Sequence, residues 1–484
     1  MSGLSGVIQY HEATKHSPSS VRYTSKRLDW STKPDPFKTY TELPGIVLPP
    51  ASPDTGFPAT SALAGARGPS RPLDGGELTR LLTLGAGIRR VLQLPNGDPV
   101  YFRTYACAGA LYPIEVYVAC AGIDGLEAGL YHYSPLDDAL RQLRSGNPRP
   151  HVLRASGGRG SVAEAPVSVL LTGIPWRTTW KYRQRGYRHL FWDSGMILAN
   201  LLALSASGGH SSEVVLGFDD GELNRLIGVD GHKEMAICIV PIGTATEGSS
   251  AAQIPAGPAQ PIDHPSARLS HWEKEYDEIV QAHGLSGISG IDEAQLWHQD
   301  PFLVNQPPPE FLSADGIEKV IRRRGSKRVL DRTYSIPIKE LAGVIDHACY
   351  KLDCDWGRQI SQVGVLAHSI EDLDRGAYAF VNGFDPITRG DLREKGQFLC
   401  LDQPLGGDGV ATIFLLADLE DATRNLGNRG YRAAQLDAGI TAGRLYLGAY
   451  ACGFGASGLT FYDDEVRSFF ETEAEPMLAV ALGR

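Results

Sequence analysis

Short apolar runs and one long amphipathic segment follow one another in the first part of the chain. The runs at 116–119, 167–172 and 236–240 have the length and the β-branched content of strands. Between the last two runs, apolar residues at i, i+3, i+4 and i+7 spacing predict a helix over about 187–207. The glycine pair at 208–209 would end this helix.

The second part of the chain carries the same pattern. The run ATIFLLA at 411–417 predicts a strand, and 431–451 predicts a helix that ends before Gly453. Both long helices are rich in Ala, Ser and Gly, so one could pack closely against the other. The pattern predicts an α+β fold made of two copies that share a helical interface.

A repeated set of motifs supports this duplication. Each motif of the first part recurs 244 residues later, and a constant spacing over 36 residues is hard to obtain by chance. A weaker match pairs GLEAGLYHY (125–133) with DLDRGAYAF (372–380). The repeated elements are RGYR at 185–188 and 429–432, Asp193 with Gly195 and Asp437 with Gly439, and FDD at 218–220 and YDD at 462–464.

The repeat divides the chain into four parts. Residues 1–59, with six prolines between 18 and 50, indicate an ordered but irregular N-terminal arm. The two copies occupy 60–245 and 305–484. Between them, 246–304 is rich in Pro, Ala, Ser and Gly at its start and predicts a linker with a connecting helix.

Composition narrows the functional classes. The net charge is −10 and no long run of Lys or Arg occurs, which argues against nucleic acid or an anionic membrane as the main partner. The seven cysteines form no C-x-x-C pair, so neither a disulfide framework nor a structural metal site is expected, and a cytoplasmic location is predicted. No stretch of 18 uninterrupted apolar residues predicts a membrane span.

A basic segment near the start of the second copy could hold a phosphate. Arg324, Ser326 and Arg328 alternate along the chain, after a helix expected to begin near Ser313 and Asp315. Two guanidinium groups and a hydroxyl can converge on one phosphate through charge-assisted hydrogen bonds. The alternative is a solvated basic helix end, which the helix dipole favours.

A loop of small residues precedes the first strand of the first copy. Its members Ala106, Cys107, Ala108, Gly109 and Leu111 would let a flat ring system approach the backbone amides. The alternative is a tight loop needed for packing. Cys107 has no visible base nearby in the sequence, so a buried small side chain is favoured over a nucleophile.

The dipeptide Lys181-Tyr182 precedes the first RGYR motif. A desolvated lysine beside a tyrosine could donate or accept protons, whereas most such pairs are surface residues. At the 244-residue spacing the second copy has Asn425-Leu426, so the pair does not belong to the repeated scaffold.

Other signals point to structure. The repeated aspartates at 219–220 and 463–464 are interpreted as caps of following helices and not as metal ligands. His11 and His16 are five residues apart and do not match a zinc-protease helix. No G-x-G-x-x-G opens a helix after a strand, so a Rossmann domain is not supported.

Taken together, these motifs resemble the nitroreductase-like flavoproteins, and among them the SagB/ThcOx-type dehydrogenases of thiazolines and oxazolines. The resemblance covers nearly the whole chain. It rests on the arm YHEATKHSPSSVR…LDWSTKPDPFKTY, on AGALYPIEVY (108–117), GLYHY (129–133) and the RGYR helix, and on GFDDGELNRLIGVDG (217–231). It implies two nitroreductase-like domains in tandem that form an intramolecular pseudo-dimer.

The resemblance also implies FMN at the interface of the two copies. Arg324, Ser326 and Arg328 match the family's phosphate-binding triplet, whereas 59–66 of the first copy has no arginine. The small-residue loop survives only in the first copy, because the second has the divergent CDWGRQIS at 354–361. Thr460 and Phe461 align with the loop that contacts flavin N5. One complete site and one lost site are therefore predicted. The group usually has Pro-Ser where this chain has Ala106-Cys107, which puts one flavin hydrogen bond in doubt.

By the same resemblance, Lys181 and Tyr182 abstract a proton while FMN accepts a hydride from an azoline-type heterocycle on a peptide or a similar small molecule. A cyclodehydratase partner and further dimerisation are compatible with this prediction. Two alternatives stay open at this point. One is an NAD(P)H-dependent nitro or quinone reductase, and the other is a structural subunit of a heterocycle-forming complex that flavin only stabilises.

Overall fold

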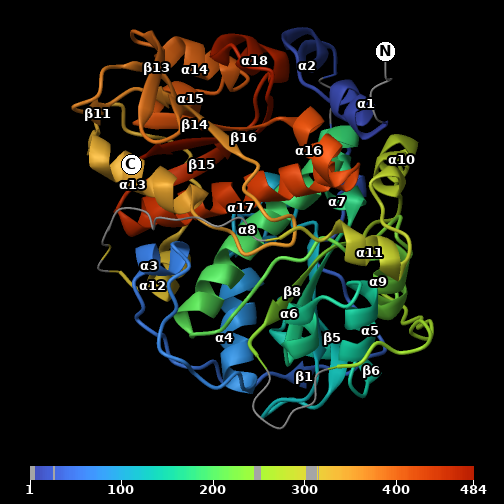
Figure 1. Ribbon diagram of the computed structural model, residues 1–484. Coiled ribbons are helices and arrows are strands. Elements are labelled where there is room, and N and C mark those ends of the chain that lie inside the picture. The colour runs from blue at the N-terminus through green and yellow to red at the C-terminus, as the bar shows by residue number, and fades with distance from the viewer. Residues whose placement is uncertain (1–5, 25–27, 245–251, 301–312, 314) are drawn as a thin grey trace.

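Two six-stranded sheets lie on opposite sides of a pair of long helices (Figure 1). The structure, a computed structural model, describes residues 6–24, 28–244, 252–300, 313 and 315–484. Neighbouring strands in both sheets run antiparallel. The predicted α+β class is confirmed by this arrangement.

The N-terminal segment and the first half comprise α1 (Gly6–Ala13), α2 (Pro18–Thr24), β1 (Ile46–Val47), α3 (Ala59–Leu63), α4 (Gly75–Ala86), β2 (Ile88–Gln93), β3 (Pro99–Arg103), β4 (Ile114–Cys120), β5 (Gly129–Ser134), β6 (Ala139–Ser145), α5 (Arg149–Ala155), α6 (Gly160–Glu164), β7 (Val167–Gly173), α7 (Pro175–Tyr182), α8 (Gly186–Ser207), α9 (Asp220–Ile227) and β8 (Met235–Ile242).

The connecting segment and the second half comprise α10 (Asp277–Leu285), α11 (Ile291–Trp297), α12 (Ile317–Arg323), β9 (Ile336–Pro337), α13 (Ile338–Cys349), β10 (Gln362–Ala367), β11 (Ile370–Glu371), β12 (Gly376–Phe380), β13 (Phe384–Arg389), α14 (Arg393–Leu399), α15 (Leu405–Asp408), β14 (Ala411–Ala417), α16 (Leu419–Leu426), α17 (Arg429–Ala451), β15 (Gly455–Leu459), α18 (Asp463–Phe470) and β16 (Glu475–Gly483).

The two sheets share a common set of five strands. The first has the order β1-β6-β5-β4-β7-β8 and the second β13-β12-β10-β14-β16-β15. The order β6-β5-β4-β7-β8 thus corresponds to β13-β12-β10-β14-β16. The predicted strands are found in β4, β7, β8 and β14, and the two predicted long helices are α8 and α17.

The helices α8 and α17 pack against each other along the centre of the molecule (Figure 1). Their backbones meet where Gly195 faces Gly439. A methyl group built on Gly195 would lie 2.3 Å from the carbonyl carbon of Gly439, so a side chain on either glycine would force the helices apart. Because these glycines are equivalent in the repeat, the interface has the twofold character that the sequence predicted.

Reciprocal ion pairs fasten each half to the other. Asp463 on α18 lies 2.9 Å from Arg185 and 3.0 Å from Arg188, the arginines of the first RGYR motif. Asp220 on α9 lies 2.7 Å from Arg429 and 2.6 Å from Arg432 in the same way. The RGYR motif is therefore repeated because each copy binds an aspartate of the opposite half.

The capping prediction for the repeated aspartates holds at one position and fails at the other. Asp219 caps α9, because its carboxylate accepts a hydrogen bond from the Glu222 N–H. Asp463 does not cap α18, whose N-cap residue is Tyr462. The structural equivalence of the two halves is shifted here by one residue from the 244-residue spacing. The first residue of α9 is Asp220 and the first residue of α18 is Asp463, and both face arginines.

Helices α1 and α10 occupy equivalent positions. The Arg188 guanidinium donates to the His11 carbonyl, and the Arg432 guanidinium donates to the His283 carbonyl. The predicted irregular arm therefore contains a helix, α1, that docks on the interface. The helix α10, which the sequence places in the connecting segment, makes the same contact with the RGYR motif of the second half.

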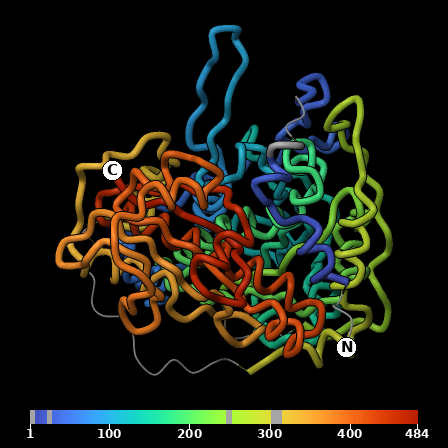
Figure 2. Tube along the Cα trace, turned by 90° about the horizontal axis from the view of Figure 1, so that it is seen from above, coloured from blue at the N-terminus to red at the C-terminus, as the bar shows by residue number. Residues whose placement is uncertain are grey.

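A two-stranded hairpin, β2–β3, projects from the body as a blue loop in Figure 2 and belongs to neither six-stranded sheet. Val91, Leu92 and Leu94 on it are exposed. In the second half, the chain between α13 and Cys354 forms no strand. The hairpin is therefore a feature of the first half alone.

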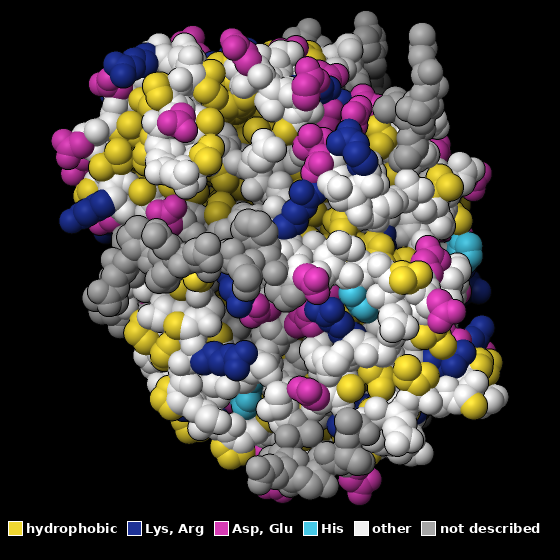
Figure 3. Space-filling model, in the orientation of Figure 1, with side chains coloured by type: hydrophobic (Ala, Val, Ile, Leu, Met, Phe, Trp, Pro, Cys, Tyr) yellow, Lys and Arg dark blue, Asp and Glu magenta, His cyan; other side chains and the backbone are white. Residues whose placement is uncertain are grey.

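One continuous helical run, Pro175–Ser207, is long and apolar enough to resemble a membrane span, but 94% of its most apolar window is buried inside the protein. Core helices of this kind pass the same test. On the face shown in Figure 3, acidic and basic side chains are interspersed and not gathered by sign.

Candidate functional site

A cavity of about 960 Å³ lies between the two halves. The first half contributes the end of the hairpin, the loop at 105–110, the end of α7 and one face of α8. The second half contributes the segment after α12 and the end of β15. The predicted site residues that line it are Arg324, Ser326, Arg328, Ala106, Cys107, Ala108, Gly109, Lys181, Tyr182, Thr460 and Phe461. Of the predicted residues, Leu111 alone is buried outside this lining.

The basic segment after α12 forms one end of the cavity. Arg324 is buried and donates to the carbonyl oxygens of Thr104 (3.0 Å) and Arg103 (3.1 Å), so it also fastens the two halves together. The Ser326 hydroxyl lies 3.3 Å from the Tyr446 hydroxyl on α17, and Arg328 is exposed at the cavity wall. Helix α12 begins at Ile317, a few residues later than the sequence predicted, because neither Ser313 nor Asp315 caps it.

The small-residue loop forms a second wall. Gly109, Ala110 and Tyr112 have positive φ angles of 64°, 53° and 48°. Two of these residues have side chains, so the loop holds a conformation that costs on the order of 1–3 kcal/mol per residue. Strained backbone of this kind is typical of binding sites.

Asp193 on α8 holds this loop in place. Its carboxylate accepts hydrogen bonds from the Cys107 thiol (3.1 Å) and the Ala108 N–H (3.2 Å). Burial raises the pKa of Asp193 to about 7. Burial and the neighbouring carboxylate of Asp193 raise the pKa of the Cys107 thiol well above its usual value, so this cysteine is not an activated nucleophile.

Lys181 and Tyr182 lie directly beside the loop. A methyl group built on Gly109 would lie 3.0 Å from the Tyr182 hydroxyl and 3.2 Å from Lys181 Nζ. Burial lowers the pKa of Lys181, which makes its neutral, basic form easier to reach. Burial, with Cys107 and Asp193, raises the pKa of Tyr182, which keeps its hydroxyl protonated. The pair therefore offers a proton acceptor and a hydrogen-bond donor at one point of the wall.

The end of β15 supplies backbone groups to the cavity. In the parts of the chain that the structure describes, the N–H groups of Thr460 and Phe461 donate no hydrogen bond. Phe461 is nevertheless buried at 1% exposure. A ligand with acceptor atoms at this point would satisfy these donors.

The pseudo-symmetric counterpart of the cavity is filled by the loop of the second half that contains Asp353 and Asp355. Val214, the counterpart of Gly458, donates to the Asp353 carbonyl (2.9 Å) and accepts from the Asp355 N–H (3.1 Å). The N–H groups of Leu216 and Gly217, which stand at the 244-residue spacing from Thr460 and Phe461, donate to the Asp355 carboxylate at 2.7–3.0 Å. The loop of the second half thus occupies the space that the cavity occupies in the first.

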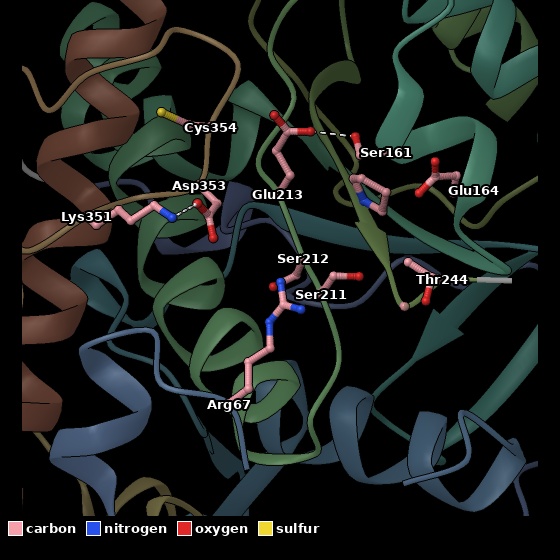
Figure 4. Close-up of a pocket in the computed structure, with 12 residues that line it drawn as sticks. Arg67, Ser161, Glu164, Ser211, Ser212, Glu213, Thr244, Lys351, Asp353 and Cys354 are labelled. Carbon is pink, nitrogen blue, oxygen red and sulfur yellow. Dashed lines mark hydrogen bonds and ion pairs between the residues drawn. The ribbon is translucent and has the colours of Figure 1, made fainter. Parts of the chain in front are cut away.

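A smaller pocket of about 300 Å³ remains near this closed position (Figure 4). Arg67, Lys351, Glu213 and Asp353 point into it, with Lys351 paired to Asp353 and Glu213 bonded by Ser161. Arg67 lies one residue beyond the range 59–66, in which no arginine occurs. Mixed charge and small size set this pocket apart from the basic end of the large cavity.

Sequence reasoning missed several residues of the large cavity. Most of them lie on α8, just before it, or on the β2–β3 hairpin, and one lies on α17. Periodicity alone marked the helix residues as core. The signal that could have found some of them is the repeat itself, because His189 and Trp192 have Ala433 and Leu436 as counterparts. The missed lining residues include His189, Trp192, Asp193, Arg185, Tyr446, Arg89, Arg90 and Phe102.

Comparison with known proteins supports the duplication. The model of the Nitroreductase family matches residues 70–244 and, separately, 321–484. A crystal structure from Anabaena variabilis that carries the name nitroreductase superimposes with a TM-score of 0.79 at 25% identity, covering 99% of each chain. Two separate matches of one family model confirm the tandem arrangement.

Two further proteins are similar to parts of the chain. MJ1384 of Methanocaldococcus jannaschii, also named as a nitroreductase, is 27% identical over 178 residues, which are 37% of this chain and 84% of that protein. The microcin B17-processing protein McbC of Escherichia coli is 30% identical over 133 residues, which are 26% of this chain and 49% of McbC. The match therefore spans about half the length of McbC.

Proposed function

The chain belongs to the nitroreductase family of oxidoreductases, and on that premise we propose that it is an FMN-dependent dehydrogenase of azoline-type heterocycles carried on a peptide or a similar small molecule. The observation that supports this proposal most strongly is the large cavity. It gathers residues of both halves that the family resemblance assigned to one flavin site, and its pseudo-symmetric counterpart is closed.

The residues of the cavity fit FMN. The basic end around Arg324 and Arg328 suits a phosphate. The N–H groups of Thr460 and Phe461, which donate to no described residue, suit the polar edge of a flavin ring. The strained loop at Gly109 brings backbone against the same space. Ala106 and Cys107 replace the Pro-Ser of the resembled group, and the Cys107 thiol donates to Asp193, so it is not assigned a bond to flavin.

The chain's own residues would orient the substrate and move one proton. With FMN held by Arg324, Ser326 and Arg328, the site would gain an acceptor for a hydride from a substrate C–H, and dioxygen would be the final acceptor. The lowered pKa of Lys181 suits it to take the proton that leaves the adjacent carbon. The raised pKa of Tyr182 suits it to donate a hydrogen bond to the substrate. The substrate thereby loses one hydride and one proton, which converts an azoline into an azole.

The similarity to McbC supports a peptide substrate, because that protein is named for processing microcin B17. A cyclodehydratase partner, which would form the azoline ring, is part of the same proposal. The cytoplasmic location and further dimerisation remain predictions from the sequence.

The proposal is tested by counting flavin and by measuring turnover. We expect one FMN per chain in the purified protein and a loss of two hydrogens from a thiazoline peptide, detected by mass spectrometry. Lys181→Ala should lower kcat about 10²- to 10⁴-fold, the usual contribution of a general base, while FMN content stays at one. Two flavins per chain, or a protein that binds none after reconstitution, would contradict the proposed site.

The same experiment separates the alternatives. Rapid flavin reduction by NAD(P)H, with turnover of a nitroaromatic that survives Lys181→Ala, would instead favour the reductase. Unchanged heterocycle formation in Lys181→Ala and Tyr182→Phe, with loss only on deletion of the chain, would favour a structural subunit.

A further inference from the structure

His189 is a buried residue of the cavity whose ring nitrogens, like the Tyr105 hydroxyl, have no hydrogen-bond partner in the described chain. Its side chain is 5% exposed, it lines the cavity, and neither ring nitrogen has a hydrogen-bond partner among the described residues. Leaving buried polar atoms unpaired is unfavourable, because they lose their hydrogen bonds to water and gain none in the protein. Such a residue at a cavity wall points to a ligand that pairs with it.

The position of His189 connects it to the proposed proton-transfer pair. Its ring stacks on the Tyr182 ring, with centroids 4.3 Å apart and planes at 24°. Its other neighbour is Trp192, at 4.6 Å in an edge-to-face contact. His189 therefore lies on the same wall of the cavity as Lys181 and Tyr182.

The duplication provides an internal control for this residue. Arg185 and Asp193 also line the cavity, but Arg429 and Asp437 make matching contacts in the other half, so both belong to the shared scaffold. The counterpart of His189 is Ala433. Like Lys181 and Tyr182, His189 occurs only where the cavity is open.

We propose that His189 hydrogen-bonds a backbone amide that flanks the reacting ring of a peptide substrate. A neutral imidazole has one donor and one acceptor nitrogen, and an amide offers a carbonyl oxygen and an N–H in return. Burial and the nearby Arg185 keep the imidazole neutral, because both lower the pKa of His189 well below its ordinary value. This assignment rests on the proposed function, since it names the substrate class of the same site.

The test separates hydrogen bonding from packing. His189→Phe keeps an aromatic ring against Tyr182 but removes both nitrogens, and His189→Gln keeps a donor and an acceptor without the ring. The probes are a short peptide with one thiazole between two amides and free 2,4-dimethylthiazole, each titrated into FMN-loaded protein and followed by flavin absorbance. Both are product-like and need no turnover.

We expect His189→Phe to weaken binding of the thiazole peptide about 5- to 30-fold, the effect of losing one or two hydrogen bonds. His189→Gln should stay within about threefold of wild type, and the free thiazole should bind all three proteins alike. His347→Phe, on α13 outside the cavity, shows the cost in thermal stability of the same exchange at another buried histidine.

The outcomes distinguish the two proposals. Equal affinity of wild type and His189→Phe for the peptide would overturn the His189 assignment and leave the dehydrogenase proposal standing. A wild-type protein that binds neither probe and does not oxidise a thiazoline peptide would overturn both. Loss of FMN from His189→Phe would show that the residue contacts the cofactor and not the substrate, which also contradicts the assignment.

Discussion

The two halves place a loop opposite a strand end in the same way, yet one of these positions is open and the other is closed. In the open position, the loop at 105–110 and the segment Ser457–Phe461 stand apart around the cavity. In the closed position, Asp353 and Asp355 bond directly to Val214, Leu216 and Gly217. The difference arises because the second half has a carboxylate, Asp355, that accepts hydrogen bonds from the N–H groups of Leu216 and Gly217.

This contrast shows which parts of a duplicated fold are needed for stability and which are needed for function. The ion pairs of the RGYR motifs, the facing glycines and the aspartates on the long helices occur twice, because both halves depend on the same interface. Lys181, Tyr182, His189 and the hairpin occur once. The residues and the hairpin that occur in the first half alone all line the open cavity.

The shared interface predicts equal and large losses of stability. Asp463→Asn leaves Arg185 and Arg188 buried without their partner, and Asp220→Asn does the same to Arg429 and Arg432. Each should lower the free energy of unfolding by about 3–5 kcal/mol, measured by urea denaturation. Markedly unequal losses would show that the two ion-pair clusters are not equivalent.

The same cluster makes stability depend on pH. Although burial opposes ionisation, Arg185 and Arg188 hold the pKa of Asp463 at about 2, below its ordinary 3.8. The stability from this carboxylate is therefore present above pH 4 and is lost as pH falls toward 2. The Asp463→Asn variant should lack this part of the acid transition.

The basic segment after α12 lines the large cavity, whereas Arg67 in the first half lines the small pocket. This difference predicts a selective effect on cofactor binding. Arg328→Ala should weaken FMN binding about 5- to 30-fold by removing one charge-assisted contact, measured by titration of the apoprotein. Arg67→Ala, at the pocket of Figure 4, is the matched control and should leave FMN affinity unchanged. Equal weakening by both changes would mean that each half binds a flavin.

The smallest expected effect concerns the two aspartates on the long helices. Burial raises the pKa of Asp193 to about 7, so its stability contribution is full below pH 4 and is lost as pH rises toward 7. Asp193→Asn should therefore remove this loss, so its stability relative to wild type should be higher at pH 8 than at pH 4. Asp437→Asn should gain less, because Ser361 bonds Asp437 through both its N–H and its hydroxyl. Thermal melting across this pH range checks both.

The sequence determined the duplication, the α+β class and the long helices, because these depend on periodicity and on residues that recur at a fixed spacing. The family resemblance, and not the repeat, identified about a third of the residues that line the cavity. Only the tertiary structure decided that Leu111 faces the core, that Asp463 pairs across the interface, and that His189 lines the cavity. The tertiary structure also decided that Asp355 closes the pseudo-symmetric counterpart of the cavity. Asp463 meets Arg185 across 278 positions and Asp355 meets Gly217 across 138 positions of the chain, and a linear pattern carries no information on such contacts.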